Sequence, residues 1–116
     1  MSSYMEVMRV DDLEEGRMRC VGIEGQELLV AHAGGRFYVA DNKCPHMGTK
    51  LAQGKLEGTV VTCPGHGSRF DLVDGRVIEW TDWTGLKLGL AKLLKPASSL
   101  KTYPVKVEGG KVLVEL

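Results

Sequence analysis

The chain has 116 residues with fifteen basic and fifteen acidic side chains, and 43% of its residues are hydrophobic. This length and composition predict one globular domain over residues 1–116, and the balanced charge gives no reason to expect nucleic acid or an acidic membrane as a partner. No apolar run is long enough to span a membrane, and the N-terminus lacks the basic start and apolar stretch of a signal peptide. We therefore expect a small cytoplasmic protein.

The first third of the chain predicts short β-strands separated by polar turns. The strands are expected over 5–10, 18–23, 27–33 and 37–40, with a polar turn at 11–16 and a tight hairpin at Gly34-Gly35. Cys20 has neighbours that alternate between apolar and polar, and we expect it to be a buried core thiol. His32 is expected to have a structural or surface role.

Two short segments in the middle of the chain each pair one cysteine with one histidine. They read Cys44-Pro45-His46 and Cys63-Pro64-Gly65-His66, and they use two of the three cysteines and two of the three histidines. Two thiolates and two imidazoles suit either a tetrahedral zinc ion or a two-iron, two-sulfide cluster in which histidines ligate one iron. Zinc sites usually take like ligands from each local segment. Here both segments supply cysteine first and histidine second, which favours two neighbouring metal atoms.

The remainder of the chain again predicts strands, over 59–62, 77–78, 103–108 and 111–115, with turns at Asp74-Gly75 and Gly109-Gly110. The exception is a short amphipathic helix near residues 82–95, where Trp83, Leu86 and Leu90 share one face. Pro96 ends this helix. The whole pattern indicates an all-β fold with one helical insertion.

The two cysteine–histidine segments and their surroundings resemble the Rieske iron–sulfur family, whose pattern is Cys-x-His, a spacer of mid-teens length, and Cys-x-x-His. The resemblance extends through residues 39–43, 67–71, 74–77 and 100–105. It implies antiparallel β-sheets with a cluster-binding subdomain of two hairpin loops. It also implies one Rieske-type [2Fe-2S] cluster, with Cys44 and Cys63 on one iron and His46 and His66 on the other.

The residues around the expected cluster imply a low reduction potential. High-potential members of the family carry a disulfide across the cluster, and serine and tyrosine hydroxyls that donate hydrogen bonds to its sulfurs. This sequence has Thr49 and Gly65 at the disulfide positions, Ser68 at the serine position and Phe70 at the tyrosine position. Ser68 is therefore expected to contact the cluster. The missing donors predict a potential of roughly −150 to 0 mV.

The resemblance implies a soluble one-electron carrier rather than an enzyme, with no catalytic residues of its own. Its expected partners are a flavin reductase as donor and a terminal oxygenase or another redox enzyme as acceptor. Two alternatives remain open: a small redox subunit of a larger reductase complex, similar to the small subunit of nitrite reductases, and a zinc-stabilised binding module. The inserted segment from Trp80 to Lys95 either packs on the sheet or provides a docking surface for a redox partner.

Overall fold

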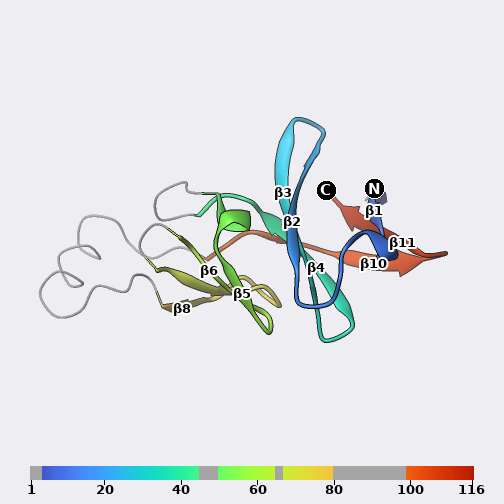
Figure 1. Cartoon of the computed structure of the whole chain (residues 1–116). Helices are drawn as coiled ribbons and strands as arrows, with labels where there is room; N and C mark the ends of the chain where they lie inside the picture. Colours follow the sequence, from blue (N-terminus) through green and yellow to red (C-terminus); the bar gives the residue numbers. More distant parts are fainter. Residues whose placement is uncertain (1–3, 45–49, 65–66, 80–98) are drawn as a thin grey trace, which may run out of the picture.

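The computed structural model describes residues 4–44, 50–64, 67–79 and 99–116, which form three antiparallel sheets (Figure 1). The terminal sheet has the order β1 (Tyr4–Arg9), β11 (Lys111–Glu115), β10 (Val105–Glu108). The central sheet has the order β2 (Met18–Ile23), β3 (Gln26–Ala33), β4 (Arg36–Asp41), β9 (Thr102–Tyr103). The distal sheet has the order β5 (Lys55–Glu57), β6 (Val60–Thr62), β7 (Arg69–Asp71), β8 (Val77–Glu79). Two 3-10 helices, η1 (Val10–Asp12) and η2 (Leu51–Gln53), complete the described elements.

This arrangement confirms the prediction of an all-β antiparallel fold. The helix predicted near residues 82–95 lies outside the described residues, as does the whole segment from Trp80 to Lys95. No helix in the described ranges has the length and apolar character needed to cross a membrane.

The predicted strand over 103–108 is wrong in one respect, because the chain changes sheets at Pro104. On one side of this residue β9 pairs with β4 in the central sheet, and on the other side β10 pairs with β11 in the terminal sheet. Proline has no N–H to donate to a β-ladder. The break therefore falls where continuous pairing would lose a hydrogen bond.

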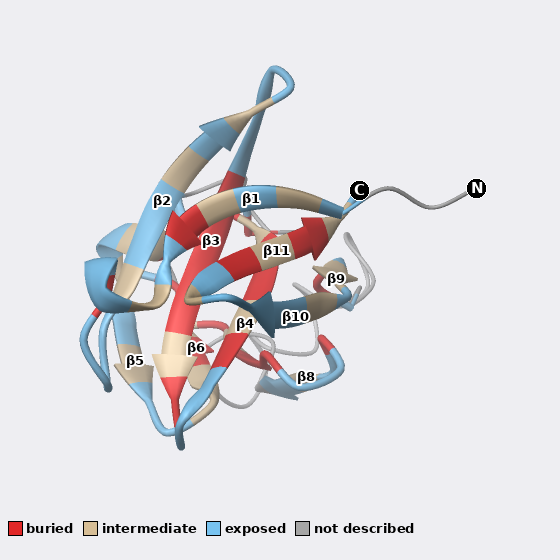
Figure 2. Cartoon of the chain, turned by 90° about the vertical axis from the view of Figure 1, so that its right-hand side faces the viewer, coloured by how far each residue is buried: buried red, intermediate tan, exposed pale blue. Residues whose placement is uncertain are grey.

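β3 separates two hydrophobic cores and is buried along most of its length (Figure 2). The first core lies between the central and distal sheets and contains Leu29, Ala31, Ala40, Cys44, Leu51, Val61, Cys63, Phe70, Leu72 and Leu100. The second core lies between the central and terminal sheets and contains Met8, Leu13, Leu28, Val30, Phe37, Val39, Val112 and Val114. Successive side chains of a strand point to opposite faces, so Leu28 and Leu29 enter different cores.

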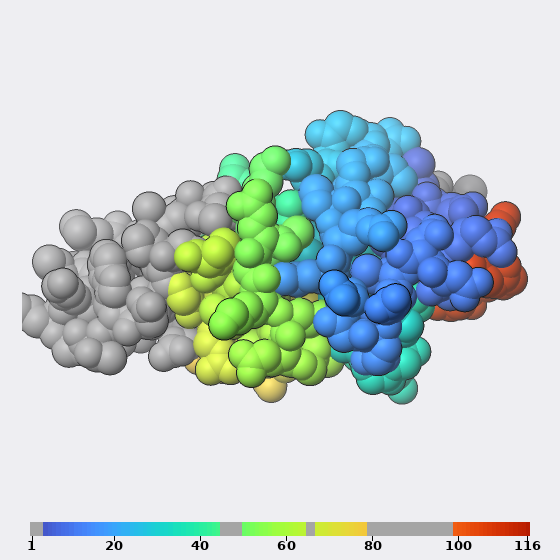
Figure 3. Space-filling view, viewed as in Figure 1, coloured from blue at the N-terminus to red at the C-terminus, as the bar shows by residue number. Residues whose placement is uncertain are grey.

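The expectation of a buried thiol at Cys20 is wrong, because Cys20 is exposed. It pairs with Leu29 in register, but β2 is an edge strand of the central sheet and has a neighbouring strand on one side only. Its thiol donates a hydrogen bond to Oε1 of Glu27 over 3.6 Å. β2 is in contact with η2, and both lie on the face shown in Figure 3.

His32 has the structural role that the sequence predicts. Its Nδ1 atom lies 2.8 Å from the carbonyl oxygen of Leu13. Its ring stacks on the cross-strand neighbour Phe37, with 4.1 Å between the ring centroids. These contacts attach the segment before β2 to the hairpin between β3 and β4.

Candidate metal centre

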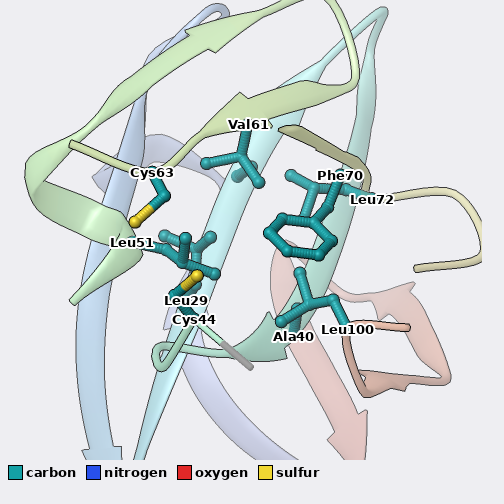
Figure 4. Close-up of a cluster of buried hydrophobic side chains, with 10 residues drawn as sticks. Leu29, Ala40, Cys44, Leu51, Val61, Cys63, Phe70, Leu72 and Leu100 are labelled. Carbon is teal, nitrogen blue, oxygen red and sulfur yellow. The ribbon is translucent and has the colours of Figure 1, made fainter. Parts of the chain in front are cut away.

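The two predicted thiolate ligands meet in the first core, although they follow strands of different sheets. Cys44 lies three residues after the end of β4, and Cys63 comes directly after β6. They are only 1% and 2% exposed. Figure 4 shows both sulfur atoms beside Leu51 at one end of the core, with Phe70 and Leu100 at the other.

The chemistry of this pair suits a metal centre. All three cysteines lie in the described ranges, and none of them forms a disulfide. Two buried thiols supplied by two loops fit the thiolate half of either an iron–sulfur cluster or a zinc site. The described ranges contain no group of three or more metal-ligating side chains, and His46 and His66 lie outside them. The imidazole half of the ligand set therefore stays a prediction.

Backbone hydrogen bonds close the second ligand loop around Cys63. The N–H of Cys63 donates to the carbonyl of Ser68 (2.7 Å), and the N–H of Gly67 donates to the carbonyl of Cys63 (3.2 Å). Gly67 has a φ of 73°, in the left-handed region that glycine adopts without steric cost. Ser68 is fully buried. The structure thus places Ser68 in the ligand loop, and its predicted contact with a cluster sulfur stays a prediction.

Lys50, the first residue that the structure describes after Cys44, forms a charged pair with β3. Nζ of Lys50 is 3.1 Å from Oε1 of Glu27 on β3. This hydrogen bond and the charge of Lys50 lower the pKa of Glu27. Partial burial, followed by the charge of Glu27, raises the pKa of the Cys20 thiol. The thiolate form of Cys20 is thus disfavoured, which agrees with its position outside both cysteine–histidine segments.

The family model for the Rieske [2Fe-2S] domain matches residues 3–104, a span that contains both cysteine–histidine segments. The chain belongs to the Rieske [2Fe-2S] domain family. Membership implies one Rieske-type [2Fe-2S] cluster as the cofactor, as the sequence predicts.

Rieske ferredoxins are among the proteins most similar to this chain. The ferredoxin component of the naphthalene 1,2-dioxygenase system of Pseudomonas aeruginosa is 32% identical over 114 residues, which cover 97% of this chain and 95% of that protein. The Sphingomonas yanoikuyae B1 ferredoxin has a TM-score of 0.77 and 27% identity, covering 98% of this chain and 99% of its own.

A ferredoxin seen together with its oxygenase is equally similar. The structure is the complex of reduced oxygenase and oxidized ferredoxin in carbazole 1,9a-dioxygenase, and its matching chain has a TM-score of 0.77 and 27% identity, with 96% of this chain and 91% of that chain covered. The relatives named here are ferredoxins or ferredoxin components. They confirm the prediction of an electron-transfer protein rather than an enzyme.

Two residues that the sequence motifs do not point to support the ligand loops of this Rieske domain. Asn42 accepts a hydrogen bond from the N–H of Ala52 (2.7 Å), and Gly54 packs directly on the backbone at Thr62. The side chain of asparagine often bonds to nearby backbone groups. An asparagine two residues before Cys44 could therefore have indicated a residue that supports the loop. The close approach at Gly54 has no local signal, because it depends on the fold.

Proposed function

We propose that this chain carries one electron at a time from a reductase to a terminal oxygenase, through a [2Fe-2S] cluster held by Cys44, Cys63, His46 and His66. The observation that carries the proposal is that the first two of these residues, 19 positions apart in the sequence, are buried in one core without a disulfide between them. The ferredoxin components named above support the choice of an oxygenase system. We also propose that residues 1–116 act as one domain and that the protein works in the cytoplasm.

The cluster supplies a one-electron redox couple when bound, and the residues around it determine its reduction potential. Replacing two thiolates with neutral imidazoles makes the site less negative, which raises its potential above that of an all-cysteine ferredoxin. Phe70, which is fully buried, offers no hydroxyl to stabilise the reduced state. We therefore predict a reduction potential of roughly −150 to 0 mV, which potentiometric titration would measure.

The ligand assignment is tested by electron paramagnetic resonance (EPR) of the dithionite-reduced protein, with iron and sulfide measured on the same sample. We expect about two irons and two sulfides per chain and the low average g value of a histidine-ligated cluster. Stoichiometric zinc without sulfide would instead establish a zinc-stabilised module and would overturn the proposal.

Single variants show which residues are the ligands. Cys44→Ser, Cys63→Ser, His46→Ala and His66→Ala are each expected to abolish the histidine-ligated EPR signal. Cys20→Ser is the matched control, because Cys20 is exposed and its hydrogen bond to Glu27 can also be donated by a serine hydroxyl. Loss of the signal in Cys20→Ser, or its survival in any of the other four variants, would contradict the assignment.

The direction of electron flow is tested with partner proteins. The reduced chain should be reoxidised by a terminal oxygenase with its substrate present, and the oxidised chain should be reduced by a flavin reductase with a nicotinamide cofactor. A chain that exchanges electrons only within a stable, larger reductase complex would favour the alternative role as a redox subunit.

A further inference from the structure

The side chain of Asn42 joins the two ends of the first ligand loop. Asn42 follows β4 directly and precedes Cys44 by two residues. Its Oδ1 atom accepts a hydrogen bond from the N–H of Ala52 in η2, with 2.7 Å between the two atoms. This bond closes a loop of residues 42–52, which contains both of the proposed ligands of the first segment, Cys44 and His46.

The same residue also fixes the base of the loop to the central sheet. The backbone N–H of Asn42 donates to the carbonyl oxygen of Glu27 on β3 (3.1 Å). Asn42 thus connects three elements: the end of β4, the strand β3 and η2. Because a backbone bond holds its main chain to β3, the bond from its side chain attaches Ala52 to the central sheet.

Packing alone does not account for an asparagine at this position. Asn42 is only 2% exposed, and its buried Nδ2 atom makes no hydrogen bond of good geometry with the described residues, although the side chain interacts weakly with the thiol of Cys20. A buried donor without a partner is unfavourable, and an apolar side chain of similar size would avoid that penalty. The bond from Oδ1 to Ala52 is the contribution that leucine could not make.

The ion pair between Lys50 and Glu27 also links the returning end of the loop to β3, but it is weaker. Both side chains are about half exposed, so water and salt screen their attraction. The bond from Ala52 ends on the side chain of Asn42, which is only 2% exposed, so water and salt screen it less. Asn42 is therefore the stronger constraint on the loop.

The residues next to this bond belong to the candidate metal centre. Leu51 precedes Ala52 directly, and it lies beside the sulfur atoms of Cys44 and Cys63 in Figure 4. A loop that opened at Ala52 would move Leu51 away from the two cysteines. Water would then reach the sulfur atoms that Leu51 now covers.

We propose that Asn42 is a positioning residue for the redox centre: by holding Ala52 against the end of β4, it fixes the two described ends of the first ligand loop and keeps Leu51 beside the cysteine sulfurs. This inference rests on the proposed function, since it assumes that the loop holds a cluster. Asn42 itself need not touch the cluster.

The test compares Asn42→Leu, which removes the acceptor but keeps the number and branching of the side-chain heavy atoms, with the wild-type holoprotein. The g values of the reduced cluster should shift, and release of iron to a ferrous chelator should accelerate about tenfold or more, the usual range for losing a residue that orients metal ligands. Asn42→Asp, which retains the acceptor oxygen for Ala52, should restore slow release. Wild-type g values and wild-type release in Asn42→Leu would overturn the proposal.

Val112→Ala is the matched structural control. Val112 is fully buried in the second core, so its truncation should lower thermal stability without changing the g values or the release of iron. If Asn42→Leu does not fold, Asn42→Ala carries the same expectation. If neither variant folds, Asn42 is a folding residue and the proposal fails. A wild-type protein that binds no iron–sulfur cluster would refute the proposed function itself, before any variant is compared.

Discussion

Tyr103 donates a hydrogen bond to Asp41 where β9 pairs with β4. The hydroxyl oxygen lies 2.5 Å from Oδ1 of Asp41. Burial of the phenol, followed by this bond and the charge of Asp41, raises the pKa of Tyr103 from 10.0 to about 12. The N–H of Asp41 donates to the carbonyl of Lys101 (3.0 Å), so side chain and backbone both attach this strand end to the C-terminal segment.

The raised pKa predicts a loss of stability at alkaline pH. The folded state holds the proton of Tyr103 more tightly than the unfolded state, so its contribution is complete below pH 10 and disappears as the pH rises to about 12. Tyr103→Phe should therefore lower the free energy of unfolding by about 1–2 kcal/mol at neutral pH. The difference from wild type should vanish above pH 12.

Denaturant unfolding of both proteins at neutral and alkaline pH measures this difference. Ultraviolet titration of the phenolates provides an independent measurement, because the highest step should be absent in Tyr103→Phe and retained in the control Tyr4→Phe, which alters an exposed residue. A constant difference between wild type and Tyr103→Phe at every pH would show that the hydrogen bond is not responsible.

At the scale of elements, Gly54 allows η2 and β5 to pack directly on the second ligand loop. A Cβ atom at this position would lie 1.9 Å from the carbonyl oxygen of Thr62 and 3.1 Å from Cδ of Pro64. These two residues flank Cys63. The obstructing atom is backbone, so it cannot move aside as the end of a flexible side chain would.

Gly54→Ala should therefore displace the second ligand loop. We expect a loss of about 1–3 kcal/mol in the free energy of unfolding, together with lower iron content, since the shift reaches Cys63. Thermal unfolding and iron analysis of the purified protein test this expectation.

Gly22→Ala in β2 is the matched control, because a Cβ there would meet only the carbonyl oxygen of Gln26 at 3.9 Å, an ordinary contact. This variant should retain the wild-type iron content and stability. If Gly54→Ala behaves in the same way, the close approach at Thr62 has no energetic consequence.

The sequence predicted the elements whose pattern is local. β2 and β11 have the predicted bounds, since their apolar residues alternate or their ends are marked by glycine turns. The sequence did not predict β5 and β7, which have only three residues each. β6 and β8 are equally short, but they contain consecutive β-branched residues, which favour strands. β5 and β7 each place one apolar residue between two charged ones, and their extended conformation depends on pairing with β6.

The candidate site was predictable to a similar extent. Chemistry identified the cysteines, because two thiolates and two imidazoles in a repeated order suit few other sites. The exposure of Cys20 was not predictable, since an alternating pattern does not tell an edge strand from a central one. The supporting contact at Gly54 joins segments that only the folded structure brings together.

At the scale of the whole molecule, the central sheet divides the protein into a part with the candidate metal centre and a part without it. The terminal sheet and the second core lie on one side, and the distal sheet and the first core, with both cysteines, lie on the other (Figure 1). Leu28 and Leu29 are adjacent in β3 and equally inaccessible to solvent, at 0% exposure. Substituting Leu28 therefore tests the packing on one side of the central sheet, and substituting Leu29 tests the other.

Leu28→Ala and Leu29→Ala should have similar costs but different effects on the cluster. Each removes a fully buried leucine side chain, so each should lower the free energy of unfolding by about 2–5 kcal/mol. Only Leu29 shares its core with Cys44 and Cys63. Leu29→Ala should therefore also shift the g values of the reduced cluster and accelerate release of iron to a chelator.

The comparison depends on measuring stability and cluster properties in the same two variants. Leu28→Ala serves as the control, because it leaves a cavity of similar size on the opposite face of the same strand. Equal changes in g values and iron release in both variants would mean that the central sheet transmits packing defects from one core to the other. A change in Leu29→Ala alone would establish that the environment of the metal centre is set by the first core, independently of the stability of the rest of the fold.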